Sequence, residues 1–117
     1  MWRRVNTRDL TCSPSEIVTV RGAYFNVSRL QGSVSYTNEQ ASMIPGVTVA
    51  LRRLGEHEQL DVASTDNQGR FAFGLHPDGW YQVETCKNGL NSVIAPVRVS
   101  RTATRDHPIQ LHVSIAN

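Results

Sequence analysis

The sequence predicts an all-β chain, folded as a two-sheet Greek-key, immunoglobulin-like sandwich of about seven to eight strands. Three observations carry this prediction. Segments in which apolar and polar residues alternate recur at intervals of about ten residues, as in sandwiches. Turn-forming Gly, Pro, Asn and Asp separate these segments. No segment of about ten residues carries the helical period of about 3.6.

The stretch from residue 65 to residue 81 shows this pattern most clearly. Residues 66–69, Asp-Asn-Gln-Gly, predict a tight turn, because Asp and Asn form local hydrogen bonds and Gly accepts a positive φ. A second turn is predicted at residues 77–79, Pro-Asp-Gly. The strand between the turns is expected to point three apolar side chains inward: Phe71, Phe73 and Leu75. A second sheet must then cover this apolar face.

The other strands follow from β-branched content or from alternation. Before residue 30, β-branched residues favour a strand at 17–20, and the apolar segment 23–27 either continues it or forms a short strand of its own. Alternation predicts further strands at 30–36, 47–52, 59–65, 80–87, 95–99 and 109–115. The last of these should turn four residues inward: Ile109, Leu111, Val113 and Ile115. We expect antiparallel or mixed pairing.

Length and charge fit one small domain. With 117 residues the chain can bury a single core, which we divide into a basic arm with extra strands at 1–28 and the sandwich at 29–117. The formal net charge of +2 is too small to indicate a nucleic-acid partner. No apolar run is long enough to span a membrane, and no secretory leader is visible, so we expect either a cytosolic chain or a mature product whose leader was removed or is not shown.

The two cysteines, Cys12 and Cys86, cannot form a metal site alone. An even pair far apart in a small all-β chain predicts a disulfide, and with it an extracellular, cell-surface or periplasmic location. Two unrelated buried thiols are the alternative. The sequence leaves open whether a bond would form within one chain or between two chains.

Five segments together resemble the carboxypeptidase regulatory-like domain. They are Leu-Gln-Gly-Ser-Val at 30–34, Ile-Pro-Gly-Val-Thr-Val at 44–49, Thr-Asp-Asn-Gln-Gly-Arg-Phe at 65–71, Pro-Asp-Gly-Trp-Tyr at 77–81 and Lys-Asn-Gly-Leu at 87–90. The resemblance covers roughly residues 30–115 and leaves 1–28 outside it. It implies a prealbumin-like (transthyretin-like) sandwich and a non-catalytic, extracellular or periplasmic module, often attached to enzymes, receptors or surface proteins.

No arrangement of residues predicts catalysis, a cofactor or a metal. Four histidines, His57, His76, His107 and His112, lack a spacing that would bring metal ligands together. No serine lies in a Gly-x-Ser-x-Gly nucleophile elbow. An enzyme or a metal protein is therefore the least favoured class of function.

Two outward residues are candidates for a binding surface, Trp80 and His112. Trp80 and Tyr81 are consecutive and face opposite sides of their strand; Tyr81 keeps the core register, so Trp80 points outward. A loop or the N-terminal arm could cover Trp80, or it could contact a sugar or a protein. Residues 26–28, Asn-Val-Ser, match the N-glycosylation pattern, whose use depends on the source of the chain.

We therefore expect a non-catalytic, secreted or surface-exposed module for protein or carbohydrate recognition, or with a structural role. The alternative is a self-assembling extracellular filament or pilin-like subunit, in which the N-terminal segment is donated to a neighbour's open sheet edge. The residues of this candidate assembly strand are Ile17, Val18, Val20, Phe25 and Val27. The partner is accordingly another protein, a carbohydrate or a second copy of the chain.

Overall fold

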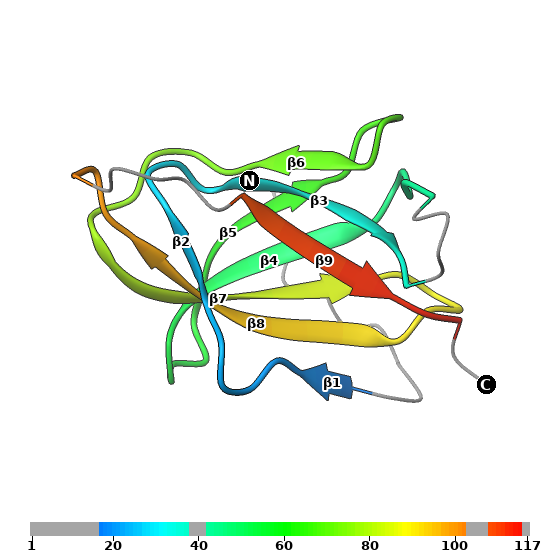
Figure 1. Ribbon diagram of the computed structural model, residues 1–117, viewed down its shortest axis with the longest axis horizontal. Helices are drawn as coiled ribbons and strands as arrows, with labels where there is room; N and C mark the ends of the chain where they lie inside the picture. The colour runs from blue at the N-terminus through cyan, green and yellow to red at the C-terminus, as the bar shows by residue number, and fades with distance from the viewer. Residues whose placement is uncertain (1–16, 38–41, 103–107, 116–117) are drawn as a thin grey trace, which may run out of the picture.

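A computed structural model describes residues 17–37, 42–102 and 108–115, which form nine strands in two sheets (Figure 1). The strands are β1 (Ile17–Thr19), β2 (Phe25–Val27), β3 (Gln31–Tyr36), β4 (Thr48–Arg53), β5 (Gln59–Ser64), β6 (Arg70–Ala72), β7 (Gly79–Cys86), β8 (Ser92–Val99) and β9 (Ile109–Val113). The described residues form no helix. The predicted all-β, two-sheet sandwich is confirmed.

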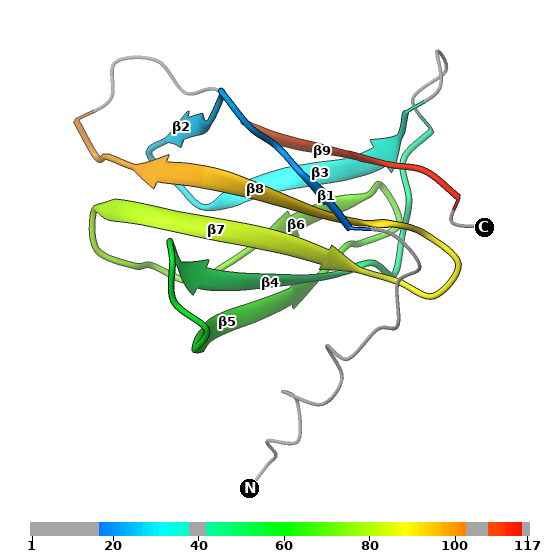
Figure 2. The same ribbon diagram turned by 90° about the horizontal axis from the view of Figure 1, so that it is seen from below.

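The larger sheet has six strands, with β8, β7, β4 and β5 side by side in that order (Figure 2). The β8–β7, β7–β4 and β4–β5 pairs are antiparallel. Both short N-terminal strands pair with β8 in parallel, β1 at residues 92–94 and β2 at residues 97–99. The segment 17–27 therefore extends one edge of this sheet.

The smaller sheet has the order β6-β3-β9. β3 pairs with β6 antiparallel and with β9 parallel, so both sheets are mixed. Gly32 lies where β3 and β9 come closest: a Cβ built on it would lie 2.3 Å from the Ile109 carbonyl oxygen. Glycine at this position is what allows the close approach of the two strands.

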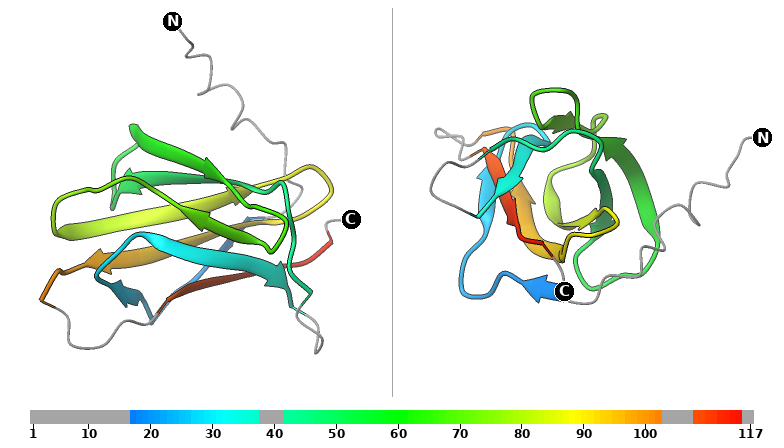
Figure 3. Two further views of the ribbon diagram at one scale, coloured as in Figure 1. Left: turned by 90° about the horizontal axis from the view of Figure 1, so that it is seen from above. Right: turned by 90° about the vertical axis from the view of Figure 1, so that its right-hand side faces the viewer.

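The core fills the space between the sheets, which enclose it when the molecule is viewed end-on (Figure 3, right). Its largest fully buried side chains include Tyr81 and Leu51 from the larger sheet and Ile109 and Leu111 from the smaller. Inward residues alternate with outward ones along β7 and β9, as predicted. The inward orientation of Tyr81 is confirmed by its complete burial.

Three details differ from the predictions. The structure has nine strands rather than seven or eight, because segments 17–19 and 25–27 pair separately with β8. The prediction that Leu75 points inward is wrong: β6 ends at residue 72 and Leu75 is 90% exposed. The prediction for Ile115 is also wrong, because β9 ends at residue 113 and this side chain is 69% exposed. In both cases the alternation of inward and outward residues is correct within the strand but was predicted to continue past the last residue of that strand.

The predicted tight turn at residues 66–69 is present. Asp66 Oδ1 accepts hydrogen bonds from the backbone N–H groups of Gln68 and Arg70, at 2.8 and 2.9 Å. Gly69 has a φ of 75°. A short polar side chain followed by a glycine with positive φ is the turn chemistry that the sequence indicated.

Candidate functional site

Trp80 lies on the outer face of the six-stranded sheet, at the start of β7. Its side chain is 44% exposed, and the ring of Tyr24 packs against it edge-on, with centroids 4.8 Å apart and planes at 67°. Tyr24 is itself 51% exposed and comes from the link between β1 and β2. The N-terminal segment therefore widens the aromatic surface around Trp80 and leaves a large part of the indole accessible.

Polar residues flank the aromatic pair in the strand register. Arg98 of β8 lies directly beside Trp80, and Asn26 of β2 lies directly beside Arg98. Directly paired residues share one face of a sheet. Arg98 is exposed and makes no ion pair with any described residue. The Asn26 Oδ1 is buried and has no hydrogen-bond partner in the described part of the chain, so an acceptor is left unused beside this surface.

Leu54 extends the surface on the opposite side of Trp80. Its N–H donates to the Trp80 carbonyl at 3.2 Å, and its side chain is 46% exposed. We call the residues Tyr24, Leu54, Trp80 and Arg98 the Trp80 surface. Further along the same face the outward charges are paired: Arg52 Nη1 lies 2.6 Å from Glu84 Oε1. The Trp80 surface is therefore an accessible apolar area at one end of the sheet, separate from the exposed Ile17 and Val18 of β1 at the other end of β8.

His112, the other predicted surface residue, lies on the smaller sheet. Its Nδ1 is 3.0 Å from the Ser35 hydroxyl oxygen on the neighbouring β3. Because His112 and Trp80 both point outward from different sheets of the sandwich, the structure does not bring them together. They belong to two separate surfaces.

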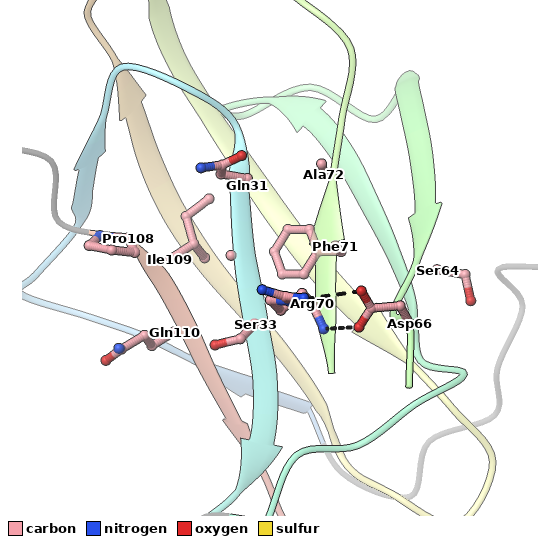
Figure 4. Close-up of a pocket in the computed structure, with 11 residues that line it drawn as sticks. Gln31, Ser33, Ser64, Asp66, Arg70, Phe71, Ala72, Pro108, Ile109 and Gln110 are labelled. Atoms are coloured by element: carbon pink, nitrogen blue, oxygen red, sulfur yellow. Dashed lines mark hydrogen bonds and ion pairs between the residues drawn. The ribbon is translucent and has the colours of Figure 1, made fainter. Parts of the chain in front are cut away.

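A groove of about 590 Å³ crosses the smaller sheet (Figure 4). Its lining combines apolar residues with the polar side chains of Gln31, Ser33, Arg70 and Gln110. The Arg70 guanidinium already has two partners, the Asp66 carboxylate, with Nε and Oδ2 3.9 Å apart, and the Gln68 side-chain oxygen. The groove offers hydrogen-bonding groups, but its positive charge is already paired.

The electrostatics of Asp66 follow from its turn. The Arg70 backbone N–H, followed by that of Gln68, holds the pKa of the Asp66 carboxyl below its usual value of 3.8. The carboxylate is therefore ionised at neutral pH and remains bound to its turn. This role is structural, and it leaves Asp66 unsuited to proton transfer near neutral pH.

The candidate assembly residues differ in burial. Val27 is 2% exposed and belongs to the core, and Phe25 packs partly against it. Ile17 and Val18, by contrast, are 57% and 39% exposed. Val20 packs partly on the core, and its N–H donates to the Ile94 carbonyl at 2.8 Å. Within one chain β2 is thus anchored by side chains, whereas β1 is held mainly by backbone pairing.

Cys86 closes β7 and is buried, with 7% of its surface exposed. It follows Trp80 by an even number of residues, which places it on the outer side of the same strand. The disulfide predicted for it involves Cys12, which lies outside the described residues, so the bond stays a prediction. The basic part of the N-terminal arm also lies outside them.

Several residues of these surfaces were not singled out from the sequence, namely Tyr24, Leu54 and Arg98. Each can be placed only through pairing between distant strands, which local patterns do not specify. A weak signal existed for Tyr24, because an apolar segment at 23–27 must pack against some partner. No sequence pattern indicated a partner for His76, whose Nε2 lies 3.0 Å from Asp61 Oδ2.

Residues 17–37, 42–102 and 108–115 contain no group of three or more His, Cys, Asp or Glu side chains that could hold a metal ion. Over the same residues, no helix has the length and apolar character needed to cross a membrane. No family model and no curated protein matches the chain. The resemblance to the carboxypeptidase regulatory-like domain therefore stays a prediction.

Proposed function

We propose that the chain is a non-catalytic recognition module, secreted or surface-exposed, which binds a protein partner through the Trp80 surface. The observation that carries the proposal is the half-exposed Trp80, packed against Tyr24 and flanked by Leu54 and Arg98. Trp, Tyr and Arg are the residue types most enriched in the energetic centres of protein interfaces. A cluster of exposed apolar side chains on a small domain commonly marks a contact surface.

The shape of the surface favours a macromolecular partner. Neither of the two described cavities includes a residue of the Trp80 surface. Small molecules usually bind in concave pockets that cover most of their surface, whereas proteins bind flatter areas. A carbohydrate chain is the second ligand class, because an exposed Trp face can pack against the apolar face of a sugar ring while Arg98 binds hydroxyl groups.

Two predictions from the sequence agree with the proposed setting. The predicted disulfide of Cys86 fits an oxidising compartment. The resemblance to carboxypeptidase regulatory-like domains implies a module that accompanies other extracellular or periplasmic proteins. Turnover of a defined substrate, abolished by one point mutation, would contradict the non-catalytic assignment.

Binding to arrays of extracellular proteins and of glycans tests the proposal, with three versions of the chain. We expect Trp80→Ala to weaken binding to any specific protein ligand by about tenfold or more. His112→Ala is the matched control, because it removes an exposed ring from the opposite sheet and should leave binding unchanged. Equal binding by wild type and Trp80→Ala would overturn the proposal, and a Trp80-dependent glycan would replace the protein partner by a sugar.

Self-assembly by strand donation is the alternative function. It is favoured by one observation, the exposure of Ile17 and Val18 in a strand held mainly by its pairing with β8. Such an edge strand can leave β8 of its own chain and pair with β8 of a neighbouring chain. The exchange changes the buried apolar surface little. Size measurement of the full chain and of a chain lacking residues 1–28 tests it. A polymeric full chain and a folded, monomeric deletion variant would support donation; two monomers would support pairing within the chain.

A further inference from the structure

A second cavity lies at the end of the sandwich where the turns after β2, β6 and β8 meet, on the left in Figure 1. Its volume of about 270 Å³ is near the lower end of the range for small-molecule pockets. It is lined by residues 28–31, residues 73–76, Val99 and Arg101. The Phe73 N–H donates to the Leu30 carbonyl at 2.9 Å and joins two of these turns. Turns that a rigid sandwich brings together often form ligand sites.

Basic residues line one part of the cavity. Arg29, His76 and Arg101 line it, and none of its described lining residues is acidic. The carboxylates of Asp61 and Asp78 lie 3.0 Å from His76 Nε2 and 3.7 Å from Arg101 Nε, but neither belongs to the lining. No described carboxylate forms an ion pair with Arg29. Arg29 therefore provides a guanidinium that is not paired with a carboxylate in the described part of the chain.

The apolar part of the cavity wall comes from Leu30, Phe73, Leu75 and Val99, beside the polar Ser28 and Gln31. Leu75 is 90% exposed, the highest value among the exposed large apolar residues. Its turn is held in place because the preceding Gly74 N–H donates to an Asp61 carboxylate oxygen at 3.1 Å. Contact with the apolar part of a ligand would remove Leu75 from water, which is favourable.

We infer that this cavity binds a small organic anion, a carboxylate that carries an apolar body. The Arg29 guanidinium can bind the carboxylate through two parallel hydrogen bonds, the geometry that arginine favours. Arg101 is already paired with Asp78, so Arg29 carries the recognition of the carboxylate, and Leu75 and Phe73 receive the apolar body. The inference is independent of the proposed function, because no residue of the Trp80 surface lines the cavity.

Titration of the full chain, followed by backbone amide NMR shifts, tests the inference with hexanoate, acetate and hexanamide. We expect hexanoate to shift the signals of residues 28–31 and 73–76. Hexanamide lacks the charge and acetate lacks the apolar body. Each should therefore bind at least about tenfold more weakly than hexanoate. Hexanamide binding as tightly as hexanoate, or shifts confined to other regions, would overturn the inference.

Two variants and a matched control sharpen this test. Arg29→Gln should weaken hexanoate binding about tenfold. Leu75→Ala should weaken hexanoate binding but leave acetate binding unchanged, and both side chains are exposed, so the fold should be retained. Arg98→Gln removes the same charge outside the cavity and should have no effect. Equal losses from Arg29→Gln and Arg98→Gln would show general charge attraction only and would refute a specific site.

Discussion

The outer faces of the two sheets leave different chemistry exposed. On the smaller sheet the polar groups pair with one another: His112 with Ser35, and Arg70 with Asp66. On the larger sheet, the apolar rings and chains of the Trp80 surface remain accessible, and Arg98 has no ion-pair partner among the described residues. The groove on the smaller sheet is therefore the weaker binding candidate despite its size, because the charge of Arg70 is already paired. Binding free energy is available where side chains still lose water on contact.

The largest effect on stability is expected from the predicted disulfide between Cys12 and Cys86, which would involve only one of the two sheets. Cys86 lies on the outer side of β7, so the bond would fix the N-terminal segment to the larger sheet only. We expect the free energy of unfolding of the oxidised wild type to be about 4 kcal/mol higher than that of the Cys12→Ser variant, because the bond closes a long loop. Urea denaturation measures this difference, and intact mass with and without reductant checks the bond. Two free thiols in native protein would contradict the prediction.

A smaller loss of stability is expected when the smaller sheet is disturbed at Gly32. In Gly32→Ala the new Cβ would lie 2.3 Å from the Ile109 carbonyl oxygen and 2.6 Å from its Cβ, so β3 and β9 must move apart. We expect the free energy of unfolding to fall by about 3 kcal/mol. Urea denaturation followed by circular dichroism provides the measurement.

The control for this substitution is Gly74→Ala. A Cβ at Gly74 would lie 3.7 Å from the nearest atom, an Asp61 carboxylate oxygen, which is an ordinary contact. The free energy of unfolding should change by less than about 1 kcal/mol. If Gly32→Ala is as mild as this control, the close pairing of β3 and β9 is not required for stability.

The smallest effect on stability is expected at Asp66, whose carboxylate accepts hydrogen bonds within the turn that precedes β6. Its pKa is lowered on folding by the N–H groups of Arg70 and Gln68, so its stabilising contribution is complete above about pH 4. The contribution is lost as the pH falls through the lower pKa of the folded state. Asp66→Asn keeps an acceptor oxygen but cannot titrate, so its stability should fall less steeply in acid.

Urea midpoints of the wild type and of Asp66→Asn, measured between about pH 6 and pH 2.5, check this prediction. The difference between the two curves isolates Asp66 from the other carboxyl groups. Curves that stay parallel over the whole range would show that the bonds to the turn do not depend on the charge of Asp66.

Local features of the sequence predicted much of the fold. The turn at 66–69 follows from Asp66 and Gly69, and the alternation along β7 and β9 predicted which side chains enter the core. The outward direction of Trp80 followed from the same alternation. Such features depend on neighbours in the chain, and therefore a single sequence contains them.

Long-range pairing decided the candidate sites. Tyr24 meets Trp80, and Arg98 lies between Trp80 and Asn26, because β2 and the first residues of β7 pair with the same end of β8. Leu75 is exposed because β6 ends early, which no local pattern indicated. By itself the sequence determined the strands, the turns and the facing of most side chains, since these depend on backbone geometry over a few residues. Only the tertiary structure decided which outward side chains share a surface, because that depends on the order of strands in a sheet.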